Sequence, residues 1–162
     1  MKKSVLTLFV LLIVANLSFA QSIETKIREF AKREYPSDPE MRKYVYNKQI
    51  SAYRYMKSVT DTEVKKIAIR EYHEDYSMQK YVYNNQLSAK SYMKTVKDAE
   101  VKRIAVSEYN GDYSMQKYTY NNQLSAKSYM KSVTNSTAKA TARRKYPSDY
   151  SMQKYTYDNI VK

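Results

Sequence analysis

The chain has 162 residues, among them 29 Lys and Arg, 16 Asp and Glu and a single His, so its formal net charge is +13. It has no Cys and one Gly, which excludes disulfide-stapled folds, thiol chemistry and glycine-rich phosphate loops. Such a basic excess favours anionic partners such as acidic glycans, anionic membrane faces or nucleic acid, although the same charge also keeps a protein soluble.

The first 20 residues have the layout of a secretory signal peptide. A basic start precedes an apolar run over residues 5–14, and small residues at Ser18 and Ala20 suit cleavage after Ala20. The apolar run is shorter than the roughly 20 residues that a membrane span needs. We therefore expect residues 1–20 to be removed, and the mature chain, which has no second apolar run, to be secreted or periplasmic without a membrane span.

A 37-residue repeat fills the rest of the chain. The stretch YSMQKYVYNNQLSAKSYMK over residues 76–94 returns over 113–131 with one residue changed. Three residue types recur at the same interval, namely Met41, Met78, Met115 and Met152, Tyr44, Tyr81, Tyr118 and Tyr155, and Asp38, Asp75, Asp112 and Asp149. A fixed period of this length marks a stacked repeat array. We expect one domain over 21–162, made of a half unit (21–38), three full units (39–75, 76–112, 113–149) and a truncated unit (150–162).

Each unit is predicted to form a long helix over its first 21 or so positions and a shorter helix after it. Asp38 followed by Pro39 is a strong start signal, because Asp caps free backbone amides and Pro suits the first helical position. Capping residues open the other predicted helices at Asp61, Asp75, Asp98, Asp112, Asn135 and Asp149. The expected fold class is all-α, a short α-solenoid of helix-turn-helix repeats with a 37-residue period and seven helices.

The pattern resembles the α-solenoids as a class, of which tetratricopeptide repeats are an example. It departs from that family's letters, because the period is 37 rather than about 34, Trp is absent and Gly occurs once. Helix pairs of this size have apolar faces too small to bury alone, and stacking gives each unit a neighbour on both sides. The same helix is therefore repeated almost unchanged because each copy meets the same environment.

A helical wheel places one apolar stripe on the long helix that starts at residue 76. The stripe, predicted to be the core, consists of Met78, Tyr81, Val82, Ala89, Tyr92, Met93 and Val96. Asn85 lies in its middle, with Lys48 and Asn122 at the same place in the neighbouring units. A buried Asn needs a partner, so Asn85 and Asn122 either fix the register between helices or lie at a solvated edge.

Lysines and tyrosines share a second face of the long helices, which carries no acid in the units that start at 76 and 113. The candidate ligand-binding residues are Lys43, Tyr46, Lys80, Tyr83, Lys90, Lys94, Lys117, Tyr120, Lys127 and Lys131. In one interpretation this face is a groove for an extended anionic polymer, with rings stacking on sugars or bases. In the other it is a second packing seam, covered by lysine stems. The pattern favours packing for Tyr83 and Leu87, and binding for the lysine rows.

No catalytic or metal-ligating constellation stands out. His73 falls in a predicted turn, and the acidic pair Glu74 and Asp75 lies at a helix start, where carboxylates favour the helix dipole. We expect no enzymatic activity, no cofactor and no metal. The leading hypothesis is an exported binding module for an acidic ligand, an anionic glycan or envelope polymer rather than nucleic acid. The alternative is a protein-interaction or assembly module that recognises a peptide or subunit through tyrosine-rich surfaces.

The C-terminal helix is predicted to leave part of its core stripe open. Residues 150–155 repeat the internal sequence without a polar replacement, and no short helix follows them to cover the stripe. Met152 and Tyr155 would then pair with a second copy through a two-fold contact, the commonest closed arrangement. We expect a weak homodimer through this helix.

Overall fold

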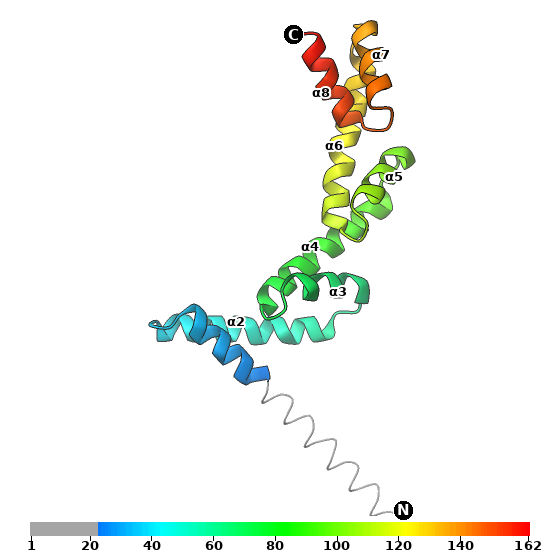
Figure 1. Ribbon diagram of the computed structural model, residues 1–162. Helices are drawn as coiled ribbons and strands as arrows, with labels where there is room; N and C mark the ends of the chain where they lie inside the picture. Colours follow the sequence, from blue (N-terminus) through cyan, green and yellow to red (C-terminus); the bar gives the residue numbers. More distant parts are fainter. Residues whose placement is uncertain (1–22) are drawn as a thin grey trace, which may run out of the picture. The chain divides into compact units, whose positions relative to one another are not determined.

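The computed structural model describes residues 23–162, so the expected signal peptide lies outside the described residues. This range is all-α and contains no strand. A helix over 23–34 is followed by α2 (Pro39–Ser58), α3 (Thr62–Glu71), α4 (Tyr76–Thr95), α5 (Ala99–Glu108), α6 (Tyr113–Ser132), α7 (Ser136–Lys145) and α8 (Tyr150–Ile160) (Figure 1). The alternation of long and short helices is confirmed. The expected count of seven is wrong, because the half unit and the truncated unit each add one helix to the six of the full units.

The predicted helix starts are confirmed by their caps. The Asp38 carboxylate accepts a hydrogen bond from the backbone N–H of Met41 at 2.9 Å, in the first turn of α2. Six further side chains each accept the same hydrogen bond from the backbone N–H three residues later: Asp61, Asp75, Asp98, Asp112, Asn135 and Asp149. Each cap satisfies one of the backbone amides that a helix start leaves without an internal partner, a contribution of about 1 kcal/mol.

The chain divides into two compact units, Met1–Tyr81 and Val82–Lys162, with α4 contributing to both. In the second unit α6 packs against α5 and α8, and α7 packs against α8. One apolar cluster there joins Met93, Val101, Ala105 and Tyr120. A second cluster repeats it 37 residues later and consists of Met130, Ala138, Ala142 and Tyr157. The same residues of the repeat therefore make the same contacts twice within this unit.

The buried face of the long helices differs from the predicted stripe. Val82, Ala89 and Met93 are buried as expected, but four tyrosines assigned to the core are 60% to 63% exposed. We call them the outer tyrosines: Tyr44, Tyr81, Tyr118 and Tyr155. Asn85 and Asn122 are exposed as well, so neither fixes a register inside the core. Six glutamines are buried instead: Gln49, Gln79, Gln86, Gln116, Gln123 and Gln153.

Three of these buried glutamines connect successive long helices. Gln49 of α2 donates to the carboxylate of Asp75 at 2.8 Å and accepts from the backbone N–H of Ser77 at 3.2 Å, both at the start of α4. The arrangement recurs from Gln86 to Asp112 and Ser114, and from Gln123 to Asp149, Tyr150 and Ser151. We call Gln49, Gln86 and Gln123 the interlock glutamines. Each binds both the cap and a free amide of the next long helix, which is why a polar side chain belongs in this core.

A second set of glutamines ties α4, α6 and α8 to the turns before them. Gln116 donates from its side-chain amide to the carbonyl oxygen of Tyr109 at 2.9 Å, and Gln153 donates to that of Tyr146 at 2.7 Å. Tyr109 and Tyr146 are the residues that end α5 and α7. These bonds satisfy carbonyl groups that a helix end leaves without an internal donor.

We expect Gln123→Met to destabilise the protein by about 1–3 kcal/mol, because the side chain keeps its length while Asp149 and the Tyr150 N–H lose their buried partner. Urea unfolding followed by circular dichroism measures the change. Asn122→Ala, one residue away on the exposed side, is the control and should shift the free energy of unfolding by less than about 0.5 kcal/mol. A larger loss for Asn122→Ala than for Gln123→Met would restore the face that the sequence predicted.

Candidate binding surfaces

Two of the candidate tyrosines lie inside the protein. Tyr83 and Tyr120 are each 3% exposed, so neither ring offers a face to a ligand. The Tyr120 hydroxyl accepts a hydrogen bond from the backbone N–H of Asp98 at 3.2 Å, and its ring meets the Tyr92 ring edge-on, with the centroids 6.3 Å apart. Tyr157 bonds the N–H of Asn135 in the same way. The burial of Tyr83 and Tyr120 agrees with the packing-seam interpretation and leaves neither ring exposed for stacking on a ligand.

Four candidate lysines are half-buried and lie over tyrosine rings. We call them the seam lysines: Lys80 over Tyr55 at 4.8 Å, Lys90 over Tyr113 at 5.2 Å, Lys117 over Tyr92 at 5.1 Å and Lys127 over Tyr150 at 5.2 Å. Each distance runs from the ammonium nitrogen to the ring centroid, within the range in which a cation is attracted to a ring face. Since each contact joins one helix to the next, the seam lysines contribute to packing.

Lys127 also carries two ion pairs. Its ammonium group lies 2.8 Å from a carboxylate oxygen of Asp98 and 2.8 Å from one of Glu100, and its side chain is 16% exposed. Hydrogen bonds from Lys127 hold the pKa of both carboxyl groups below their ordinary values, and the two carboxylates raise the pKa of Lys127. The long helix carries no acid on this face, but the neighbouring short helix and its cap supply two. The face that sequence analysis described as acid-free is therefore neutralised here by the fold.

The remaining candidates stay on the surface. Lys43, Lys94 and Lys131 are exposed, and among the described residues no carboxylate is paired with their ammonium groups. Tyr46 is half-buried, with the guanidinium group of Arg28 over its ring at 4.9 Å. The structure thus divides the ten candidates into a larger group that packs between helices and a smaller group that stays exposed.

The outer tyrosines mark a surface that sequence analysis missed. On α6, Tyr118 shares one exposed strip with Asn121, Asn122 and Ser125, none of them charged. The Asn121 side-chain oxygen also accepts a hydrogen bond from the Tyr92 hydroxyl at 2.6 Å, which holds it in place. Tyr, Asn and Ser are the residues that dominate antibody combining sites, where rigid rings supply area and amides adapt their hydrogen bonds. The signal was present as the uncharged pattern YxxNNxxS, repeated in two units.

The outer tyrosine of the C-terminal helix is about as exposed as its counterparts, whereas Ile160 is 48% exposed at the place where Gln123 is buried. Tyr155 is 63% exposed, which matches the other outer tyrosines, and Gln153 and Tyr157 of α8 are buried. The exposure of Tyr155 therefore belongs to the repeat and does not mark an open core. A homodimer through α8 stays a prediction.

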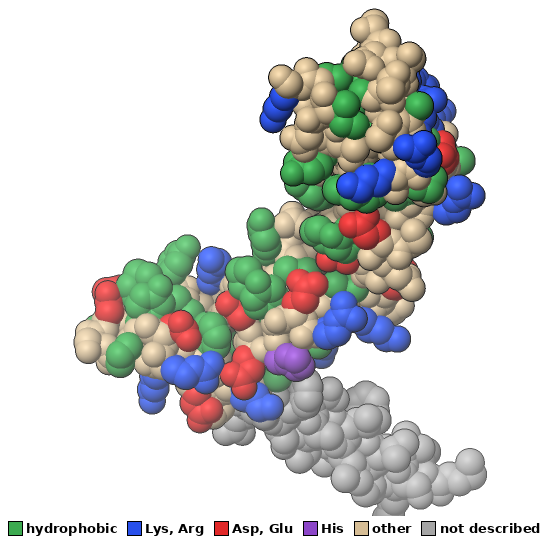
Figure 2. Space-filling model, turned by 45° about the horizontal axis from the view of Figure 1, so that its top comes forward, with side chains coloured by type: hydrophobic (Ala, Val, Ile, Leu, Met, Phe, Trp, Pro, Cys, Tyr) green, Lys and Arg blue, Asp and Glu red, His purple; other side chains and the backbone are tan. Residues whose placement is uncertain are grey.

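His73 reaches the surface in the turn between α3 and α4, as predicted (purple in Figure 2). It lines a shallow pocket of about 240 Å³ that also includes an ion pair between Arg33 and Glu74 at 3.0 Å. Lys26 and Glu29 complete a lining of mixed charge. Opposite charges that already neutralise each other give this pocket no preference for a charged ligand.

No family model, curated protein or solved structure matches this chain. From residue 23 onward, no helix has the length and apolar character required to cross a membrane. The same residues hold no group of three or more His, Asp or Glu side chains placed to bind a metal ion.

We expect Lys127→Met to weaken the acid dependence of stability. Asp98 and Glu100 have lowered pKa values in the folded chain, so their contribution is complete above the ordinary values of 3.8 and 4.5 and is lost as the pH falls through the lowered ones. The variant should be less stable than the parent at neutral pH, and the difference should vanish under strongly acidic conditions. Urea midpoints measured between about pH 7 and pH 2 test this.

The exposed Lys131→Met is the matched control for this pH series, since it removes the same charge from the same helix. Its midpoints should follow those of the parent throughout. Equal acid slopes for Lys127→Met and the parent would show that the paired carboxylates contribute nothing to folding.

Proposed function

We propose that this chain is an exported, non-enzymatic binding protein for an acidic ligand, built as a short α-solenoid of 37-residue helix pairs. The signal-peptide layout of residues 1–20 supports export. Repetition of the interlock bonds and of the apolar clusters at the 37-residue interval supports a stacked array. Removal of Lys2 and Lys3 with the signal peptide leaves 27 basic and 16 acidic residues, so the mature chain keeps a charge of +11.

The observation that carries this proposal is the set of lysines that the fold leaves outside. Lys94 and Lys131 occupy the same place in successive units, and both are exposed while the seam lysines are half-buried. Exposed ammonium groups keep their full attraction for polyanions and release counterions when they bind one. An exported protein meets acidic glycans and envelope polymers before it meets genomic nucleic acid, so we favour such a polymer as the ligand.

A second candidate function is recognition of a polypeptide. The outer tyrosines favour it, because these large rings remain more than half exposed at the same place in successive units. Tyr is enriched in protein interfaces, whereas Lys, Glu and Asp are depleted there, and the strip around Tyr118 has this composition. In this alternative the chain is an interaction or assembly module.

We expect the triple variant Lys43→Gln, Lys94→Gln and Lys131→Gln to elute from a heparin column at clearly lower salt than the parent. Three exposed charges are lost while the packing stays intact, and each lost contact reduces the counterion release on binding and so the salt dependence of retention. The control replaces three exposed cationic residues in or next to the short helices, Lys66, Lys97 and Arg103, with Gln. Retention that falls equally in both variants would mean that only net charge matters.

We expect the double variant Tyr118→Ser and Tyr155→Ser to retain heparin binding at the parent's elution salt. If a polypeptide is the ligand, the same variant should lose the partner that the parent captures from an envelope extract, and high salt should not release that partner. If the acidic polymer is the ligand, only the lysine variant should lose it. A partner retained by the tyrosine variant and lost by the lysine variant therefore rules out the second candidate.

A further inference from the structure

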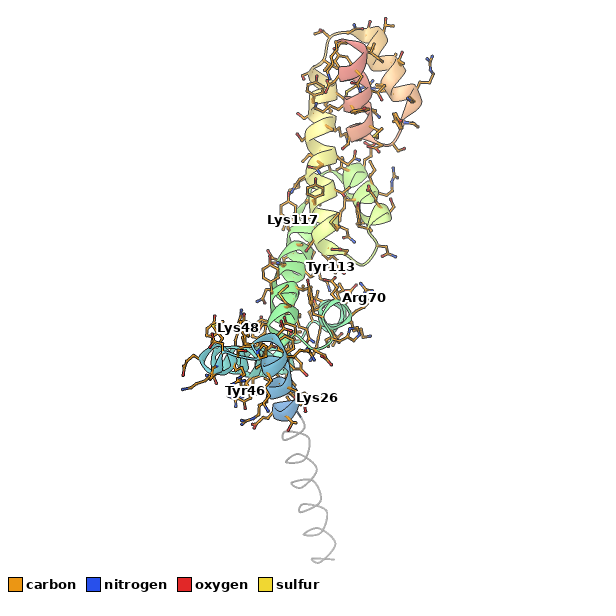
Figure 3. The ribbon with its side chains drawn as sticks, turned by 60° about the vertical axis from the view of Figure 1, so that its left-hand side comes forward. Lys26, Tyr46, Lys48, Arg70, Tyr113 and Lys117 are labelled. Carbon is orange, nitrogen blue, oxygen red and sulfur yellow. The ribbon has the colours of Figure 1, made fainter. Side chains whose placement is uncertain are left out.

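A basic pocket lies between the helix over 23–34 and α2, within the first compact unit. Its cavity of about 320 Å³ is lined by Arg28, Ala31, Lys32, Arg42, Lys43 and Tyr46. Four of these six side chains are cationic and none is acidic. Figure 3 labels Tyr46, which lies on α2 next to the 23–34 helix. The pocket joins two candidates from sequence analysis, Lys43 and Tyr46, to three cations that sequence analysis did not select.

Two of the cations are held in place by neutral groups. Arg42 donates from Nη1 to the carbonyl oxygen of Pro36 at 3.1 Å, and the Arg28 guanidinium lies on the Tyr46 ring, 4.9 Å from its centroid. A guanidinium group has five N–H donors, so each arginine keeps most of its donors for a ligand. Side chains fixed before binding lose less conformational freedom when a ligand arrives. The two arginine side chains are thus held in position by groups that leave their positive charge intact.

The repeat shows that folding does not require this charge. In later units the place of Arg42 is taken by Gln79, Gln116 and Gln153. Gln79 donates to the carbonyl oxygen of His73, which stands 37 residues after Pro36, so a neutral amide makes the bond that Arg42 makes. The place of Lys32 is taken by Ile69 and Val106 in the next two units. At the next two junctions the fold therefore accepts neutral residues at both places, whereas the last unit again has a cation, Arg143, at the place of Lys32.

We propose that this pocket binds one compact tetrahedral oxyanion, the phosphate or sulfate ester group of the acidic ligand. Four like charges around one cavity repel each other, and a dianion placed among them replaces that repulsion with attraction. Guanidinium groups bind such oxyanions through paired N–H donors, which lysine alone does not offer. This step rests on the proposed acidic ligand and gives it a chemical group: the long-helix lysines meet charge along a polymer, and the pocket holds a single ester.

The test uses mature protein and inorganic phosphate and sulfate at low salt, followed by calorimetry and by the amide signals of residues 28–46. The pocket variant combines Lys32→Ile with Arg42→Gln, the residues that the chain itself places at these points in other units. The control combines Lys94→Gln with Lys131→Gln and removes the same two charges elsewhere. We expect the pocket variant to bind the anions at least tenfold more weakly than the parent, and the control to stay within twofold.

Equal anion affinity in the parent and the pocket variant would overturn the proposal, as would an equal loss in both variants. Circular dichroism of the pocket variant checks that it folds, and Lys43→Gln, a single exposed change, provides a second measure if it does not. Heparin retention tests the acidic-polymer function separately from the pocket. A parent that fails to bind heparin refutes the acidic-polymer function, whereas loss of phosphate binding in the control as well refutes the pocket alone. Phenyl phosphate and phenyl sulfate, titrated in parallel, identify which ester the pocket prefers.

Discussion

The buried amide that binds the start of the next long helix is the contact on which the rest of the structure depends. Gln123 reaches Asp149 and the backbone of α8, and Gln86 reaches Asp112 and the backbone of α6. A buried amide that lost these partners would cost more than an apolar side chain there, so the face that carries it must point inward. Once the rotation of each long helix about its own axis is fixed in this way, the outer tyrosines must point away from the core, whatever their hydropathy. A polar bond therefore sets the orientation of helices whose apolar residues alone leave it ambiguous.

The same rotation of the long helices determines which lysines pack between helices and which stay exposed. It brings the seam lysines over rings of the neighbouring helix, and it brings Lys127 to Asp98 and Glu100. The number of cations in the sequence is therefore greater than the number that a ligand can reach, because some of them are packed or paired between helices. The cations that stay outside, such as Lys94 and Lys131, are fewer but are not shared with packing. A surface for an acidic ligand thus includes only the exposed cations and is smaller than the whole basic face.

Sequence reasoning predicted what local signals control. Asp38 with Pro39 and the later caps set the helix starts, which is why the predicted helix starts agree with the structure to within about a residue. The buried face was not predicted, since a wheel ranks Tyr118 above Gln116 and Gln123 by hydropathy. The burial of Gln123 depends on Asp149, 26 residues away, and the pairing of Lys127 depends on residues 27 to 29 positions earlier. Such partners become visible only once the helices are placed side by side, although the glutamines that recur unchanged in every full unit were a usable sign.

Differences between near-identical copies separate what the fold requires from what it permits. Where every unit needs the same bond, the residue is the same, as for the interlock glutamines; Ile160, at that place in α8, cannot donate such a bond. Where one unit has a different residue and that residue still makes the bond, folding does not require the difference. Arg42 is of this second kind, because it keeps the bond to the preceding turn and adds a charge beside Lys32. An added like charge costs stability unless something anionic meets it, so the cations that the first junction accumulates are explained more simply by a ligand than by packing.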